Sequence, residues 1–179
     1  PEPVIEGASL GVSERNLRLV QEAMSAVSNE AGGTAFRSRI VDPDMLVAGK
    51  TGTAQVRRIR TAERESGVRK NEELPWRLRD HALFVAYAPV AAPRYAISVV
   101  VEHGGSGSKS AAPIARDILI RALYGPTPPL ESYPANVRAQ IEAAWAAADR
   151  AQAAGETTDG AFMWGVDGAG EPAAPSDFG

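Results

Sequence analysis

Four consecutive residues, Lys50-Thr51-Gly52-Thr53, combine a cation, two hydroxyls and a glycine within a stretch that reads as a β-strand. Side chains alternate between the two faces of a strand, so the two threonines are expected on one side and the lysine and glycine on the other. Two hydroxyls at this spacing can bind one carboxylate, and Lys50 adds a fixed positive charge beside them. Because Gly52 has no side chain, the backbone of a ligand can approach closely there. The run therefore predicts a substrate-binding strand.

The predicted elements around this strand give an α+β fold. The strand itself is expected at about 46–57, after a helix predicted over 13–28 from its helical apolar spacing and a capping serine. Two apolar runs, 81–88 and 95–101, read as an antiparallel hairpin, and 111–124 as a closing helix. The result is an antiparallel three-stranded sheet with packed helices. Because the two later strands are almost continuously apolar, both faces of the sheet are expected to be covered.

The Lys-Thr-Gly run resembles the third active-site motif of penicillin-binding proteins and serine β-lactamases. The order of elements resembles the C-terminal part of the transpeptidase domain in class B penicillin-binding proteins, most closely the elongation type, over roughly residues 4–125. This resemblance implies that the three strands are part of a five-stranded β-lactamase/transpeptidase-like fold. The last strand, 95–101, would then be left as an exposed edge, which predicts that this chain self-associates through that edge or relies on a segment outside the 179 residues.

The resemblance also implies roles for the motif residues. Lys50 would hydrogen-bond a relay serine and make the site electropositive. Thr51 and Thr53 would bind the terminal carboxylate of a stem peptide or a β-lactam, with Gly52 between them. The backbone N–H of Thr53 would be one of two oxyanion-hole donors. Lys50 and Thr53 are thus the expected catalytic residues, and Thr51, Gly52 and Thr53 the expected substrate-binding residues.

Two further motifs of the resembled enzymes are missing from the sequence. No Ser-x-Asn triplet occurs, and the one Ser-x-x-Lys match, Ser106-Gly107-Ser108-Lys109, follows the Lys-Thr-Gly strand instead of preceding it. In a glycine-rich loop Lys109 would be solvated, so it lacks the environment that lowers the pKa of a catalytic lysine. The resemblance implies a parent protein that is a serine-type peptidoglycan D,D-transpeptidase and a β-lactam target. Because the two motifs are missing, we expect this chain to be inactive alone. The alternatives are a non-catalytic protein-interaction module and a β-lactam sensor domain.

Composition and charge argue against some classes of ligand and partner. The net charge of −3 argues against a general nucleic-acid binder, and the absence of cysteine excludes thiolate metal sites. His81 and His103 each follow a carboxylate, but neighbouring residues of a strand point to opposite faces, so structural or surface histidines are expected. No cofactor or metal is expected. The resemblance implies peptidoglycan stem peptides, β-lactams and proteins of the elongation machinery, including a glycosyltransferase, as partners.

Three regions are expected along the chain. Residues 1–125 are assigned to the C-terminal part of the transpeptidase domain, 126–154 to a proline-rich linker with an amphipathic helix, and 155–179 to a disordered tail. Residues 57–80 contain eight basic and five acidic side chains and are expected as a long solvated excursion, either functional at the mouth of the groove or a plain hairpin extension. No run of about 18 apolar residues occurs. Because the chain starts at Pro1, we expect a fragment of a membrane-anchored periplasmic protein whose anchor lies elsewhere.

Overall fold

The computed structural model describes residues 9, 11–59 and 61–155. The chain divides into two units, Pro1–Pro134 and Ala135–Gly179. In the second unit the described element is the helix α4 (Ala135–Ala153), as the alanine-rich stretch predicts. The predicted disordered tail lies outside the described residues, apart from its first residue. None of the helices in the described ranges has the length and hydropathy that crossing a bilayer requires.

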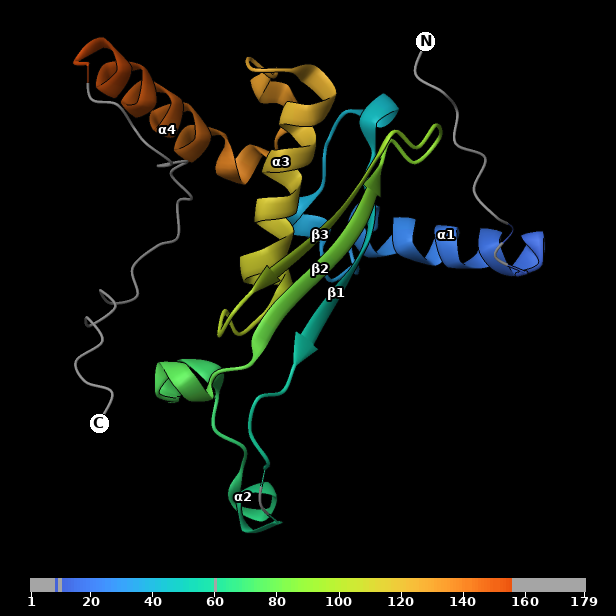
Figure 1. Ribbon diagram of the computed structural model, residues 1–179, viewed down its shortest axis with the longest axis vertical. Coiled ribbons are helices and arrows are strands. Elements are labelled where there is room, and N and C mark those ends of the chain that lie inside the picture. The colour runs from blue at the N-terminus through green and yellow to red at the C-terminus, as the bar shows by residue number, and fades with distance from the viewer. Residues whose placement is uncertain (1–8, 10, 60, 156–179) are drawn as a thin grey trace. The chain divides into compact units, whose positions relative to one another are not determined.

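The first unit is built on a three-stranded antiparallel sheet (Figure 1). The strands β1 (Ala48–Ala54), β2 (His81–Ala88) and β3 (Tyr95–Val101) lie side by side in chain order, so β2 is central and β1 and β3 are the edges. The predicted α+β class and the antiparallel three-stranded sheet are confirmed. The motif strand is shorter than predicted at both ends.

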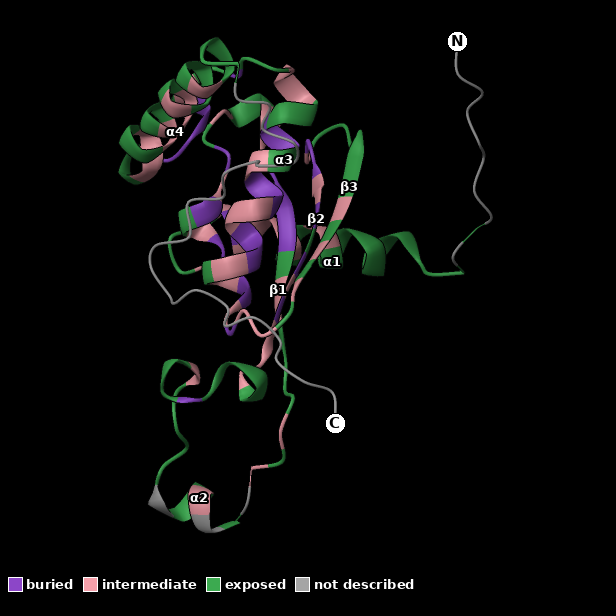
Figure 2. Ribbon diagram, turned by 60° about the vertical axis from the view of Figure 1, so that its left-hand side comes forward, coloured by how far each residue is buried: buried purple, intermediate pink, exposed green. Residues whose placement is uncertain are grey.

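The helix α3 (Ala112–Tyr124) covers one face of this sheet. It contacts both β2 and β3. Alternate residues of β2 are buried, namely Ala82, Phe84, Ala86 and Ala88, and the apolar residues that α3 buries are Ala112, Ala115, Leu119 and Ile120. Figure 2 shows buried residues on α3 and on the sheet beside it. Full burial of a side chain such as Leu119 contributes about 1.5–3 kcal/mol, so this layer is the main source of stability for the sheet.

The opposite face of the sheet is largely open, which corrects the expectation that both faces are covered. Val85 on β2 is 45% exposed and Val100 on β3 is 58% exposed. Leu83, whose backbone pairs with that of Val100, is only half-buried. Continuous apolar runs suggested two covered faces, but within the described residues only one helix layer spans β2 and β3.

The helix α1 (Glu14–Asn29) starts at the predicted cap, where the Ser13 hydroxyl accepts a hydrogen bond from the N–H of Asn16. Two of the apolar residues in its helical spacing, Leu17 and Val20, are 42% and 54% exposed. Contact with the sheet is made at the other end of the helix, where the Asn29 side-chain amide donates to the carbonyl of Val47 at 2.9 Å. The first turns of α1 therefore lack a packing partner among the described residues.

The segment between α3 and α4 is part of the first unit, not a separate linker from residue 126 onward. Tyr133 and Ser132 are each 2% exposed, and the N–H of Val41 donates to the carbonyl of Ser132 at 2.9 Å. Burial raises the pKa of the Tyr133 hydroxyl to about 12. The prolines predicted a stiff spacer, but the aromatic side chain that follows them is packed in the core.

Candidate functional site

The Lys-Thr-Gly-Thr run lies on β1, at an edge of the sheet. Lys50 and Thr53 are exposed, and Thr51 and Gly52 are half-buried. Within the described residues β1 pairs only with β2, so its other side has no strand partner. The hydroxyls are therefore accessible along an open edge and are not sealed in the core.

The register confirms the predicted alternation of the motif side chains. The two threonines pair with Phe84 and Ala82 of β2, whereas Lys50 and Gly52 pair with Val85 and Leu83. Paired residues of an antiparallel sheet point to the same face, so the hydroxyls share one face and the lysine lies on the other. The Lys50 ammonium donates to the carbonyl of Thr51 at 2.7 Å.

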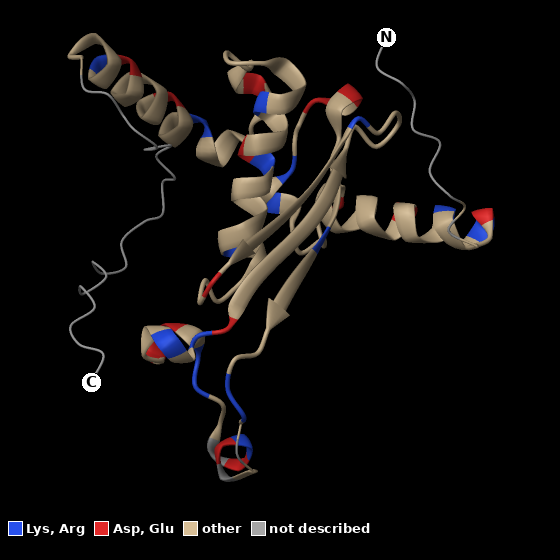
Figure 3. Ribbon diagram, in the orientation of Figure 1, with Lys and Arg blue, Asp and Glu red and all other residues tan. Residues whose placement is uncertain are grey.

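Lys50 also dominates the charge of the sheet. It is the one residue among Lys, Arg, Asp and Glu that the three strands contain. In Figure 3 the blue segment of β1 therefore stands on a sheet that is otherwise without charge. A cation on an uncharged edge favours an anionic ligand there.

Thr34 is a neighbour of the motif that the sequence gave no reason to select. Its hydroxyl lies 2.9 Å from the hydroxyl of Thr51, a hydrogen bond between residues 17 positions apart. Thr34 lies in the connector that follows α1. The turn after α1 brings Thr34 to the edge strand, and no spacing rule along the chain predicts that approach.

The glycines near the motif differ in what surrounds them. A Cβ added at Gly49 would stand 2.3 Å from Cζ of Phe84, so the ring of Phe84 occupies that space. A Cβ at Gly107 would stand 2.5 Å from the carbonyl oxygen of Gly52, so the backbone of the π-helical turn Gly107–Ala111 lies directly against β1. A Cβ at Gly52 itself would have its nearest neighbour 3.3 Å away, in the side chain of Leu83.

The Ser-x-x-Lys match after β3 has the solvated lysine that was expected. The hydroxyl of Ser106 lies 3.0 Å from that of Ser108, and Lys109 points to Glu72 at 3.7 Å, with side chains 77% and 71% exposed. Such an exposed pair gives the lysine no desolvated environment.

The two histidines take part in structural hydrogen bonds. The N–H of His103 donates to Nδ1 of His81 at 2.8 Å, and Nδ1 of His103 lies 2.9 Å from the carbonyl of Arg79, to which it donates. Within residues 9, 11–59 and 61–155 no cluster of three or more metal-ligating side chains was found.

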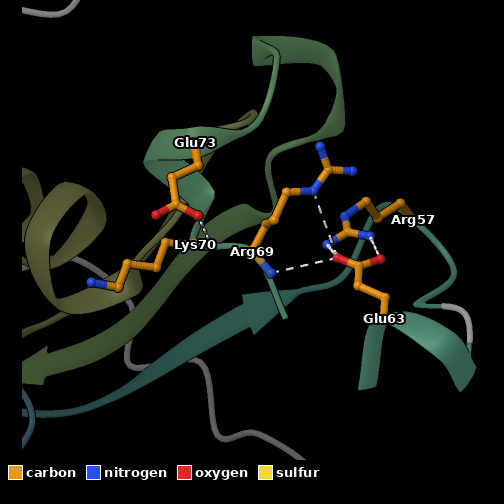
Figure 4. A network of polar contacts seen from close by, with 5 residues as sticks. All are labelled: Arg57, Glu63, Arg69, Lys70 and Glu73. Carbon is orange, nitrogen blue, oxygen red and sulfur yellow. Dashed lines mark hydrogen bonds and ion pairs between the residues drawn. The ribbon is translucent and has the colours of Figure 1, made fainter. Parts of the chain in front are cut away.

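The charged excursion between β1 and β2 is folded in short pieces. It contains α2 (Thr61–Ser66) and two 3-10 turns, and its one buried apolar residue in the described part is Leu74. In Figure 4 the guanidinium of Arg57 faces the carboxylate of Glu63 through two hydrogen bonds of 2.6 Å. These bonds, more than any other influence, lower the pKa of Glu63.

The family model and the relatives that match this chain are of one kind. The family model described as "Penicillin binding protein transpeptidase domain" matches residues 6–120. The peptidoglycan D,D-transpeptidase MrdA of Haemophilus influenzae is 38% identical over 113 residues, which are 63% of this chain and 17% of the relative. MrdA of Acinetobacter baumannii is 41% identical over 99 residues, 53% of this chain and 13% of the relative.

A solved complex between penicillin-binding protein PBP2 and MreC from Helicobacter pylori aligns with a TM-score of 0.48 at 31% identity, covering 62% of this chain and 17% of that chain. The chain thus spans less than a fifth of the length of these relatives.

Proposed function

Because the chain belongs to the family of penicillin-binding protein transpeptidase domains, we propose that it forms one wall of the active site of a peptidoglycan D,D-transpeptidase of the elongation type. The observation that carries this proposal is the accessible Lys50-Thr51-Gly52-Thr53 run on the open edge of the sheet. The parent protein would contain the nucleophilic serine and its lysine base in a segment outside these 179 residues. The three strands would be part of a five-stranded sheet in that parent.

In the proposed reaction the parent's serine attacks the carbonyl carbon of the D-Ala-D-Ala amide, and its proton passes to the base and then to the leaving D-alanine. An amine of a second stem peptide then attacks the acyl carbon and forms the new amide bond, and its proton returns to the serine oxygen as the ester bond breaks. Thr51 and Thr53 would bind the terminal carboxylate of the donor peptide. The N–H of Thr53 would donate to the oxyanion that forms at the attacked carbonyl.

In that reaction the side chain of Lys50 would move to a second position. In the structure its ammonium bonds to the carbonyl of Thr51. In the complete site it would turn to the relay serine and hold a positive charge beside the substrate carboxylate. Thr34, which shares a hydrogen bond with Thr51, would fix the orientation of that hydroxyl.

The test compares the parent with variants that lose one hydroxyl. Thr51→Val and Thr53→Val keep the side-chain shape and suit a strand, so the fold should be retained. Loss of a hydrogen bond to a charged group costs about 1.5–3 kcal/mol, or roughly 10- to 150-fold in the rate of acylation by a labelled penicillin. D-Alanine release from a stem pentapeptide should fall in parallel. Rates equal to those of the unmodified parent would remove the carboxylate-binding role.

This chain alone is proposed to be inactive, because it would supply only one wall of the site. Labelled penicillin should attach to the parent and not to the isolated 179 residues. A Ser106→Ala variant of the parent should label at the normal rate. Covalent attachment to the isolated chain would overturn this part of the proposal.

The remaining proposals concern setting and partners. The parent would be anchored in the cytoplasmic membrane with this domain in the periplasm, where it cross-links the cell wall during elongation and maintains cell shape. Its partners would be the stem peptide, β-lactams and elongation-machinery proteins, including a glycosyltransferase. The isolated chain would self-associate through the edge of β3, where Val100 is 58% exposed. Sedimentation showing a monomer at all concentrations would contradict this last proposal.

A further inference from the structure

Asp80, the residue before β2, connects three parts of the chain through four hydrogen bonds. Its carboxylate accepts from the N–H of Val56 at 3.4 Å and from the side-chain amide of Asn71 at 3.3 Å. Its own N–H donates to the side-chain oxygen of Asn71 at 2.9 Å, and its carbonyl accepts from the N–H of Gly105 at 2.8 Å. Asp80 and Asn71 are both half-buried, so water competes only partly for these bonds.

These bonds hold the end of the motif strand from two sides. Val56 follows Thr53 by three residues, at the point where β1 leaves the sheet. Gly105 begins the turn that leads to Gly107, whose backbone lies directly against Gly52. Asp80 thus contacts the chain just after the motif and also fixes the turn that packs behind the motif.

Asn71 is the partner that orients the carboxylate of Asp80. It lies at the start of a 3-10 turn in the excursion between β1 and β2. Because it both donates to Asp80 and accepts from it, the two residues form a closed pair with one fixed geometry. The excursion is therefore joined to the motif strand at its base, although most of its side chains are exposed.

We propose that the Asn71–Asp80 pair is a positioning device for acyl transfer: it sets the place of the Thr53 end of β1 relative to the substrate. This inference rests on the proposed function, because it assigns a role in that reaction. Asp80 and Asn71 act through Val56 and the Gly105 turn. A shift of about 1 Å in a catalytic group can cost roughly 100-fold in rate, so a remote pair can control the reaction by fixing one strand end.

Exchanging the two side chains between positions 71 and 80 tests the role of the pair. Asp80→Asn turns one of the two acceptors into a donor that faces the donor amide of Asn71. Asn71→Asp places a carboxylate opposite the carboxylate of Asp80. Each single change therefore leaves a mismatched pair. The double variant restores the match, because the new amide at position 80 can donate to the new carboxylate at position 71 while its oxygen accepts from Val56.

The experiment uses the full-length parent, the two single variants, the exchanged double variant and a control, Glu72→Gln. The control removes one charge next to Asn71 from an exposed pair with Lys109. Reaction with a labelled penicillin is resolved into the dissociation constant of the non-covalent complex and the rate constant of acylation. Thermal unfolding gives the folded fraction of each protein.

The single variants should acylate about tenfold or more slowly, with the rate constant carrying most of the loss. The double variant should recover to within about threefold of the parent, and Glu72→Gln should remain unchanged. Single variants that acylate at the parent's rate would overturn the inference. So would a double variant as slow as the singles, or a loss that only follows the folded fraction. A parent that forms no covalent adduct would instead overturn the proposed function.

Discussion

At the scale of single residues, the effect of adding a side chain to the motif strand depends on the atoms that surround each of its glycines. The ring of Phe84 is 3% exposed and fills the space where a side chain at Gly49 would stand. Gly52, three residues along, has more room, because the nearest atom to an added Cβ is 3.3 Å away on the Leu83 side chain. Two glycines of one strand should therefore respond differently to the same substitution.

We predict that Gly49→Ala destabilises the chain by about 1–3 kcal/mol, because a buried ring cannot move without disturbing the α3 layer. Gly52→Ala is the matched control, and it should change the free energy of unfolding by less than about 1 kcal/mol, because Leu83 can yield by a few tenths of an ångström. Thermal or denaturant unfolding measures both. Equal effects at the two positions would contradict this account of the strand.

At the scale of elements, the excursion between β1 and β2 is held in shape by charge pairing more than by apolar burial. Arg57 and Glu63, with side chains 14% and 18% exposed, pair through two short hydrogen bonds near its start. These bonds hold the pKa of Glu63 below its ordinary value of 4.5. The pair therefore stabilises the folded excursion above that pH, and this stabilisation is lost as the pH falls through the lower folded-state pKa.

We predict that an NMR titration of the Glu63 carboxyl gives a midpoint below 4.5. Arg57→Gln should raise that midpoint, since it removes the cause of the shift. Arg58→Gln, which removes the same charge one residue along, should leave it nearly unchanged. A midpoint at or above the ordinary value, or equal shifts in the two variants, would show that the pair does not form.

The elements themselves were largely predictable from the sequence, because their signals are local. The Ser13 cap predicts the start of α1, and the apolar runs predict the antiparallel order of the strands. The alternation in the motif strand predicts that the two threonines share one face. Packing was less predictable, since it depends on residues far apart in the chain. No local signal in the sequence predicts the exposure of Val100 and Leu17 or the contact between Thr34 and Thr51.

At the scale of the whole molecule, the first unit extends past its last long helix. Pro134 is among the fully buried side chains, and the aromatic ring of Tyr133 lies 5.5 Å from the guanidinium carbon of Arg116 on α3. The boundary that the structure gives, between Pro134 and Ala135, therefore differs from the one expected at 125/126. The difference arises because the side chain of Tyr133, which follows the prolines, packs in the core of the first unit.

We predict that a chain ending at Pro134 keeps the folded first unit, because it retains the buried side chains of Tyr133 and Pro134. A chain ending at Gly125 should be less stable by about 3–5 kcal/mol, the usual cost of removing a buried aromatic side chain. Tyr133→Ala in the 179-residue chain should reproduce most of that loss. Equal melting temperatures for the two truncated chains would show that residues 126–134 do not stabilise the unit.

The proposal that this chain is one wall of a divided active site is tested most directly by locating the acylated residue in the full-length parent. The parent is reacted with a β-lactam, digested, and the modified peptide is identified by mass spectrometry. We predict that the acyl group lies on a serine outside these 179 residues. An acyl group on Ser106 or another serine of this chain, or no acyl group at all, would contradict the account.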